Sequence, residues 1–111
     1  MVKELDAQQS ADVPAKVSQL VRALLPLRRG TIEEVAKLMA IAPRTLQRRL
    51  DAYGLSFKVI LADVRFEMAR EYLRGGTLST TQVAPLLGLS ESSALSRFLH
   101  DHAGVSARDL R

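Results

Sequence analysis

The 111-residue chain contains no cysteine and no tryptophan, and aromatic residues make up only 5% of it. Without cysteine, neither a disulfide framework nor a thiolate metal site can form. No apolar run approaches the roughly 18–20 residues that a membrane-spanning helix needs, and the polar start MVKELDAQQSAD does not have the pattern of a signal peptide. These absences fit a reducing compartment, and we expect a cytoplasmic protein with no membrane contact.

What the chain does contain is basic charge, and that charge is unevenly distributed. The formal net charge is +4. Eight basic and three acidic residues lie between Arg22 and Lys58, whereas Gly75 to Arg111 holds three of each sign. Apolar residues make up 47% of the chain, as in an ordinary globular domain. A small basic domain favours a polyanionic partner.

Glycine and proline are scarce, at six and four residues, so each glycine can be assigned to a helix boundary or a turn. Gly88 predicts a tight turn, and five glycines that follow helix-like runs predict helix C-caps. These five are Gly30, Gly54, Gly75, Gly76 and Gly104. Hydroxyl residues follow at the positions expected of N-caps, namely Thr31, Ser56, Ser79 and Ser106.

Apolar residues recur at helical spacing, and no stretch shows the alternation typical of a strand. The sequence therefore predicts an all-α fold. We expect seven helices, at residues 13–25, 31–39, 43–53, 57–74, 80–87, 91–103 and 106–111. In the longest, one buried face is predicted to hold Phe57, Ile60, Leu61, Val64, Met68 and Tyr72. Surface ion pairs are expected along the same helix, among Glu67, Arg70, Glu71 and Arg74.

The chain also resembles itself. A shift of 48 residues places Val35 on Val83 and Ala36 on Ala84, and a shift of 49 places Arg48 on Arg97. Each copy consists of a short helix, a three-residue turn and a longer helix, with Ala40-Ile41-Ala42 and Gly88-Leu89-Ser90 as the turns. A small residue on the first helix lets the second cross closely. This arrangement predicts two helix-turn-helix units in tandem.

Three strings carry a family resemblance: TIEEVAKLMAIAPRTLQRRLDAYGLSF, AREYLRGG and LSTTQVAPLLGLSESSALSRFLHDHAGVSARDLR. In order and spacing they resemble the DNA-binding domain of AraC/XylS-type transcriptional regulators, from about residue 17 to the end. The resemblance implies two helix-turn-helix subdomains joined by a long helix. It also implies sequence-specific binding of double-stranded DNA in transcription regulation, with both recognition helices in successive major grooves. We expect residues 1–11 to form a linker or disordered end, residues 12–56 and 75–111 the two subdomains, and residues 57–74 the joining helix.

The family's base-reading positions fall on seven residues of this chain: Arg44, Gln47, Arg48, Ser92, Ser93, Ser96 and Arg97. Arginine can donate two hydrogen bonds to guanine and glutamine can pair with adenine, so the first motif has suitable chemistry. Phosphate contacts are expected from Thr31, Lys37, Thr45 and Arg49. For the seven base-reading residues the alternative is a solvated polar helix face with no role in binding.

Several positions depart from the family pattern. Ala42 replaces a hydroxyl cap before Pro43, and Pro85 lies within a predicted helix. His100-Asp101 stands where two basic residues are usual, and Ala107 replaces a proline. We therefore expect the second motif to bind DNA more weakly and the first to supply most of the affinity.

Other functions find less support in the sequence. There is no glycine-rich phosphate loop and no nucleophile motif, so we expect no enzyme activity, no catalytic residues and no cofactor. His100 and His102 are two residues apart, which is unsuited to a shared metal. The alternative function is a helical protein-interaction module that binds polymerase or another regulator. We expect a monomer that binds no small molecule, with RNA polymerase as a further candidate partner. The chain is expected to be either a fragment that lacks an effector or dimerisation domain or a stand-alone version, and the linker-like residues 1–11 favour a fragment.

Overall fold

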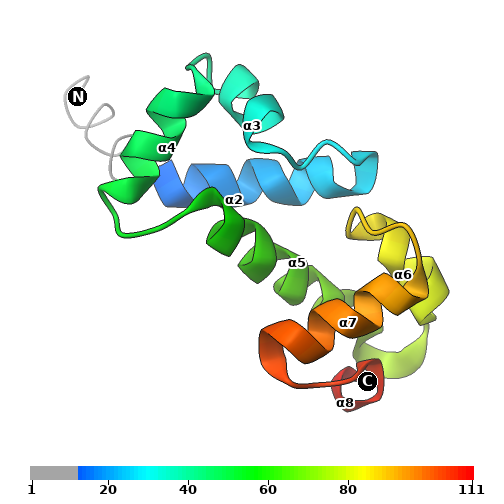
Figure 1. The fold of residues 1–111 in the computed structure, drawn as a ribbon. Helices are drawn as coiled ribbons and strands as arrows, with labels where there is room; N and C mark the ends of the chain where they lie inside the picture. The colour runs from blue at the N-terminus through cyan, green and yellow to red at the C-terminus, as the bar shows by residue number, and fades with distance from the viewer. Residues whose placement is uncertain (1–12) are drawn as a thin grey trace, which may run out of the picture.

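The computed structural model describes residues 13–111, and the predicted linker at residues 1–11 lies outside this range. Within it the chain is helical and has no strand, so the predicted all-α class is confirmed. Seven α-helices and two short 3-10 segments follow one another (Figure 1). They are α2 (Val13–Leu24), η1 (Leu25–Leu27), α3 (Ile32–Leu38), α4 (Pro43–Asp51), α5 (Phe57–Leu73), η2 (Arg74–Gly76), α6 (Thr80–Leu86), α7 (Ser92–Ala103) and α8 (Ala107–Leu110).

Three helices begin at the hydroxyl residues that the sequence indicates. The side chains of Thr31, Ser56 and Ser79 each accept a hydrogen bond from a backbone N–H of the first turn, at 3.2–3.3 Å. In α6 the Gln82 side chain also accepts from the Ser79 N–H, which completes a capping box. At α8 the backbone and hydroxyl of Ser106 both donate to the Asp109 carboxylate, which lowers the pKa of that carboxyl group.

The two helix-turn-helix turns have the same hydrogen-bond pattern. Ile41 N–H donates to the Ala36 carbonyl at 3.0 Å, and Leu89 N–H donates to the Ala84 carbonyl at 2.9 Å. This is the Schellman arrangement, which needs a left-handed residue just before the donor. Gly88 fills that position in the second turn with a φ of 75°. Its counterpart in the first turn is an alanine, Ala40, with a φ of 59°.

Replacing Ala40 with glycine is expected to raise the free energy of unfolding by about 0.5–1 kcal/mol, because relief of left-handed strain exceeds the backbone entropy that glycine loses. The reverse change, Gly88→Ala, is expected to lower it by about 1–2 kcal/mol. A Cβ at Gly88 would also lie 3.3 Å from Leu25 Cδ2. Urea unfolding of both variants measures these changes, and a destabilised Ala40→Gly variant would contradict the assignment.

Gly30 does not form the helix C-cap that the sequence predicts. The left-handed residue after η1 is Arg28, with a φ of 60°, and the φ of Gly30 is not in the left-handed range. Gly30 instead lies against Leu25, where an added Cβ would be 2.8 Å from Leu25 Cδ2. The sequence prediction was wrong because the glycine is needed for close packing rather than for backbone conformation.

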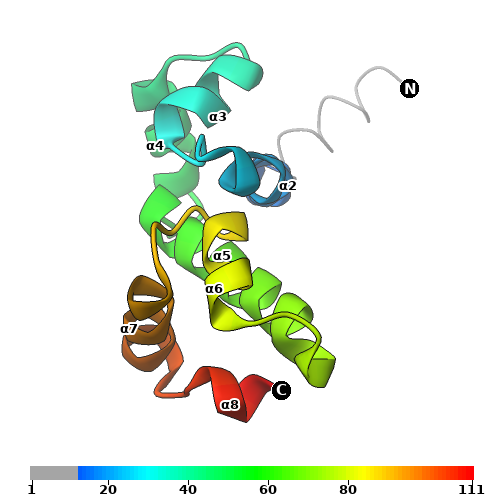
Figure 2. The same ribbon diagram turned by 90° about the vertical axis from the view of Figure 1, so that its right-hand side faces the viewer.

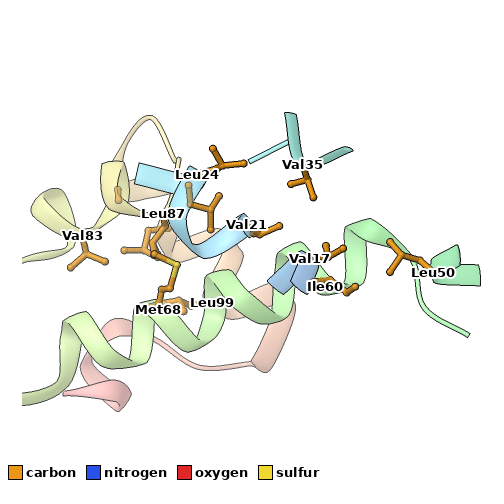
Figure 3. Close-up of a cluster of buried hydrophobic side chains, with 14 of the residues drawn as sticks. Val17, Val21, Leu24, Val35, Leu50, Ile60, Met68, Val83, Leu87 and Leu99 are labelled. Atoms are coloured by element: carbon orange, nitrogen blue, oxygen red, sulfur yellow. The ribbon is translucent and has the colours of Figure 1, made fainter. Parts of the chain in front are cut away.

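One apolar core runs along α5 and joins both helix-turn-helix units (Figure 3). At one end Leu50 of α4 and Ile60 of α5 are buried, and at the other Met68, Leu87 and Leu99 are buried. α2 packs along α5 between them, and η1 packs against α6. The buried surface of α5 is therefore wider than the single apolar face that the sequence predicts. Phe57, Leu61, Val64 and Tyr72 are partly buried, whereas Ala69 and Leu73 are fully buried on α5 as well.

The surface ion pairs of α5 also differ in part from the prediction. Arg70 pairs with Glu67 at 3.1 Å, as expected. Glu71 pairs instead with Arg22 of α2. Arg22 was among the basic residues of the first half, so this contact neutralises one of them. The remaining exposed basic residues of that half lie mainly on α3 and α4 and in the loop before α3.

Candidate nucleic-acid interface

Helix α4 presents a basic face to solvent. Leu46 and Leu50 are fully buried, which fixes the rotation of the helix. Arg44, Gln47 and Arg48 are exposed on the other side. Neither arginine forms an ion pair within residues 13–111. The structure thus brings the three base-reading residues predicted for the first motif onto one accessible surface, with their donors free for another molecule.

Helix α7 has the same construction with less charge. Leu95 and Leu99 are fully buried, as Leu46 and Leu50 are in α4. Ser93, Ser96 and Arg97 are exposed, and Ser92, the first residue of the helix, is partly buried. Beyond Arg97, His100 and Asp101 are also exposed, and neither is an arginine or a lysine. The second helix therefore offers one arginine where the first offers three.

The residues predicted to contact phosphate lie on α4 and on the neighbouring helix α3. Arg49 is exposed at its last turn, and Thr45 is partly buried. Lys37 is exposed on α3. Thr31 is exposed at the start of α3, where its side-chain oxygen caps the helix and its hydroxyl proton remains able to donate. These positions are accessible, and phosphate binding by them stays a prediction.

The two recognition helices lie on the same side of the molecule. Figure 2 shows α4 and α7 one above the other along the left-hand edge. The described chain measures 46 × 24 × 23 Å. One helical repeat of DNA is about 34 Å, so a molecule of this length can reach two successive major grooves.

The recognition helices also begin differently from their neighbours. Ala42 before α4 and Glu91 before α7 provide no side-chain cap. In contrast, α3, α5 and α6 each begin with a capping hydroxyl. The first-turn N–H groups of α4 and α7 are therefore free of a side-chain acceptor, and those of α4, which has no acidic residue at its cap or in its first turn, are suited to phosphate oxygens.

One residue near this interface was missed by the sequence analysis. Arg65 of α5 donates from Nε to the carbonyl of Leu87 at 3.0 Å, and its guanidinium carbon lies 5.6 Å from the centre of the Phe98 ring. Burial lowers the pKa of this guanidinium group, which nonetheless stays charged at neutral pH. The sequence did offer one signal for this role. Arg65 lies four residues after Leu61 and so next to the predicted apolar face of α5.

Comparison with known proteins agrees with this geometry. The sequence model of a family described as a helix-turn-helix domain matches residues 35–111, which run from within α3 to the end of the chain and include both recognition helices. The chain belongs to the AraC-type helix-turn-helix family. This is a family of DNA-binding transcriptional regulators and not of enzymes. The resemblance proposed from the sequence is thereby confirmed for this AraC-type domain.

Two curated relatives show how the AraC-type domain relates to longer proteins. The HTH-type transcriptional regulator VirS from Mycobacterium tuberculosis is 38% identical over 112 residues, which cover 98% of this chain and 33% of that protein. The ornithine utilization regulator from Pseudomonas aeruginosa is 32% identical, over 90% of this chain and 30% of that protein. The chain thus spans about a third of the length of these relatives.

Solved structures share the fold of the AraC-type domain. The C-terminal domain of AraT, a response regulator from Geobacillus stearothermophilus, superposes with a TM-score of 0.76 at 25% identity, over 89% of this chain and 83% of that one. A DNA-binding transcriptional dual regulator from Escherichia coli K-12 gives a TM-score of 0.79 at 16% identity, over 87% and 86%. At that identity the second likeness concerns the fold alone.

Within residues 13–111 no helix is long and apolar enough to span a membrane.

Proposed function

We propose that this AraC-type domain binds double-stranded DNA in a sequence-specific manner by inserting α4 and α7 into successive major grooves. The observation that carries the proposal is the placement of two buried-leucine helices on one side of the molecule, each with polar side chains exposed. Arg44, Gln47 and Arg48 are proposed to read bases from α4. Ser92, Ser93, Ser96 and Arg97 are proposed to do so from α7.

The two helices contribute unequally in this proposal. Arg49, Lys37, Thr31 and Thr45 hold phosphates around the first motif, together with the uncapped first turn of α4. The exposed Glu91 carboxylate at the start of α7 repels phosphate, and Asp101 adds a second negative charge. The first motif therefore supplies most of the affinity. Because the shared core holds both helices in a fixed arrangement, DNA bends to meet them.

We also propose the setting in which this binding takes place. One chain carries both recognition helices, so the isolated domain acts as a monomer. The DNA it regulates lies in the bacterial cytoplasm. Binding of RNA polymerase to this domain stays a prediction.

Titration of a labelled random-sequence duplex at several salt concentrations tests the proposal. We expect micromolar binding whose log–log dependence on salt corresponds to about 4–8 released counterions, because phosphate contacts dominate non-specific affinity. Fluorescence anisotropy measures both quantities. A shallow salt dependence would favour the protein-interaction alternative, and no binding at low salt would refute the proposal.

A further inference from the structure

Besides the apolar core, one partly buried arginine of the long helix α5 contacts the second helix-turn-helix unit. Arg65 contacts both parts of that unit: its Nε donates to Leu87 at the end of α6, and its guanidinium group lies over the Phe98 ring of α7. Within residues 13–111 no carboxylate pairs with Arg65. The charge is therefore compensated by a carbonyl and an aromatic face.

These two contacts are geometrically demanding. Leu87 is the C-cap of α6, where carbonyl groups lack helical donors and carry partial negative charge. A charged donor makes a stronger hydrogen bond than a neutral one, and a cation over an aromatic ring adds further attraction. A partly desolvated guanidinium group that loses these partners pays a large penalty. Arg65 therefore favours one arrangement of α6 and α7 on α5.

The turn between α6 and α7 also packs closely against the first half of the chain. A Cβ at Gly88 would lie 3.3 Å from both Cδ2 and the carbonyl oxygen of Leu25, and 3.9 Å from a terminal nitrogen of Arg65. Leu25 belongs to η1, which connects α2 to α3 in the first half of the chain. The turn thus packs against η1 of the first unit and lies close to Arg65 of the joining helix.

The other polar contacts between helices are more exposed. The side chains of Arg22 and Glu71 are 45% and 52% exposed, and Asp63, which lies 3.6 Å from His102, is 65% exposed. Ion pairs at such positions contribute little to fixing a geometry. His102 also stacks on Phe98, with ring centres 5.3 Å apart, so the ring under Arg65 is itself held in place.

We propose that Arg65 is a positioning residue that fixes the offset between α4 and α7 and thereby sets which spacing of DNA half-sites the domain accepts. This inference rests on the proposed two-groove binding. Inserting one base pair rotates one half-site by about 35° relative to the other, because DNA has about 10 base pairs per turn. A rigid protein discriminates against that change, whereas a protein whose second unit can shift tolerates it.

The positioning itself can be measured without DNA. The absence of native cysteine allows spin labels to be placed by Asp51→Cys on α4 and Asp101→Cys on α7, both exposed positions. Double electron–electron resonance measures the distance between the two labels. We expect one narrow distance distribution for the parent protein and a broader one after Arg65→Met. Arg70→Met is the matched control, because Arg70 is an exposed arginine on the same helix. An unchanged distribution in Arg65→Met would overturn the proposal.

The consequence for DNA is measured on a site selected from random duplexes by the parent protein, with the half-sites moved apart or together by one and two base pairs. For the parent protein and Arg70→Met we expect an affinity loss of about tenfold or more per step, comparable with a mismatched contact. Arg65→Met is expected to reduce that spacing preference at least about threefold, and Arg65→Lys to restore part of it, because lysine can donate to the carbonyl but lacks the planar group.

Each outcome has a distinct meaning. If Arg65→Met weakens binding by the same factor at every spacing, Arg65 only stabilises the fold and the proposal is overturned. If the parent protein binds every spacing equally, the two-groove function fails, while the label distances still report on positioning. If Arg65→Met does not fold by circular dichroism, Phe98→Leu removes the ring and keeps an apolar side chain. It is expected to broaden the distances in the same way, and failure to do so overturns the proposal.

Discussion

Replacing Arg48 with alanine is expected to weaken binding to the selected DNA site by about 1–3 kcal/mol and to relax the preference at one base pair. The side chain is exposed on α4 and makes no ion pair within residues 13–111, so its removal leaves the fold intact. Anisotropy titration against the selected duplex and its single-base variants measures both effects.

Arg49→Ala is the matched control for this experiment. Arg49 is the next residue on the same helix and is also exposed, but it is proposed to contact phosphate. Its removal is expected to weaken binding to all sequences alike and to reduce the salt slope by about one ion. If Arg48→Ala behaves in this way too, Arg48 does not read a base and the assignment made from the family resemblance is wrong.

Replacing Leu50 with alanine is expected to lower the free energy of unfolding by about 2–5 kcal/mol, the usual cost of a cavity at a fully buried leucine. Small domains are stable by only about 5–15 kcal/mol, so this is a large fraction of the total. Leu50 is fully buried at one end of the core and Leu99 at the other (Figure 3). Chemical unfolding followed by circular dichroism measures the change.

The continuous core also predicts how Leu50→Ala compares with Leu99→Ala, the equivalent change in the second unit. Because buried side chains continue along α5 from one helix-turn-helix unit to the other, Leu50→Ala and Leu99→Ala are both expected to shift one cooperative transition. Leu38→Ala, at a leucine that is 58% exposed, is the control and is expected to change stability by less than about 0.5 kcal/mol. Two separate transitions would show that the units unfold independently.

These expectations draw on features that the sequence predicted and features that it did not. The order of the seven helices, the caps at Thr31, Ser56 and Ser79, and the burial of the leucines of both recognition helices follow from short-range patterns. A cap and its amide are three residues apart, and a helical face repeats every three or four. Local sequence therefore contains all the information that these features need.

The base-reading residues are an intermediate case. The periodicity of α4 places Arg44, Gln47 and Arg48 opposite its leucines, and the structure confirms that they are exposed. Their assignment to bases came from the family resemblance. That α4 and α7 lie on one side of the molecule depends on how α5 crosses α2 and the second unit, which no local pattern encodes.

What the sequence by itself determined is the set of helices, their caps and turns, and the uneven distribution of charge. Only the tertiary structure decided that α5 is buried on more than one side, that Glu71 pairs with Arg22 rather than Arg74, and that Arg65 joins α5 to the second unit. Arg65 and Leu87 are 22 residues apart, and Arg22 and Glu71 are 49 apart. Contacts at such separations form only after helices pack, because the packing angle determines which side chains meet.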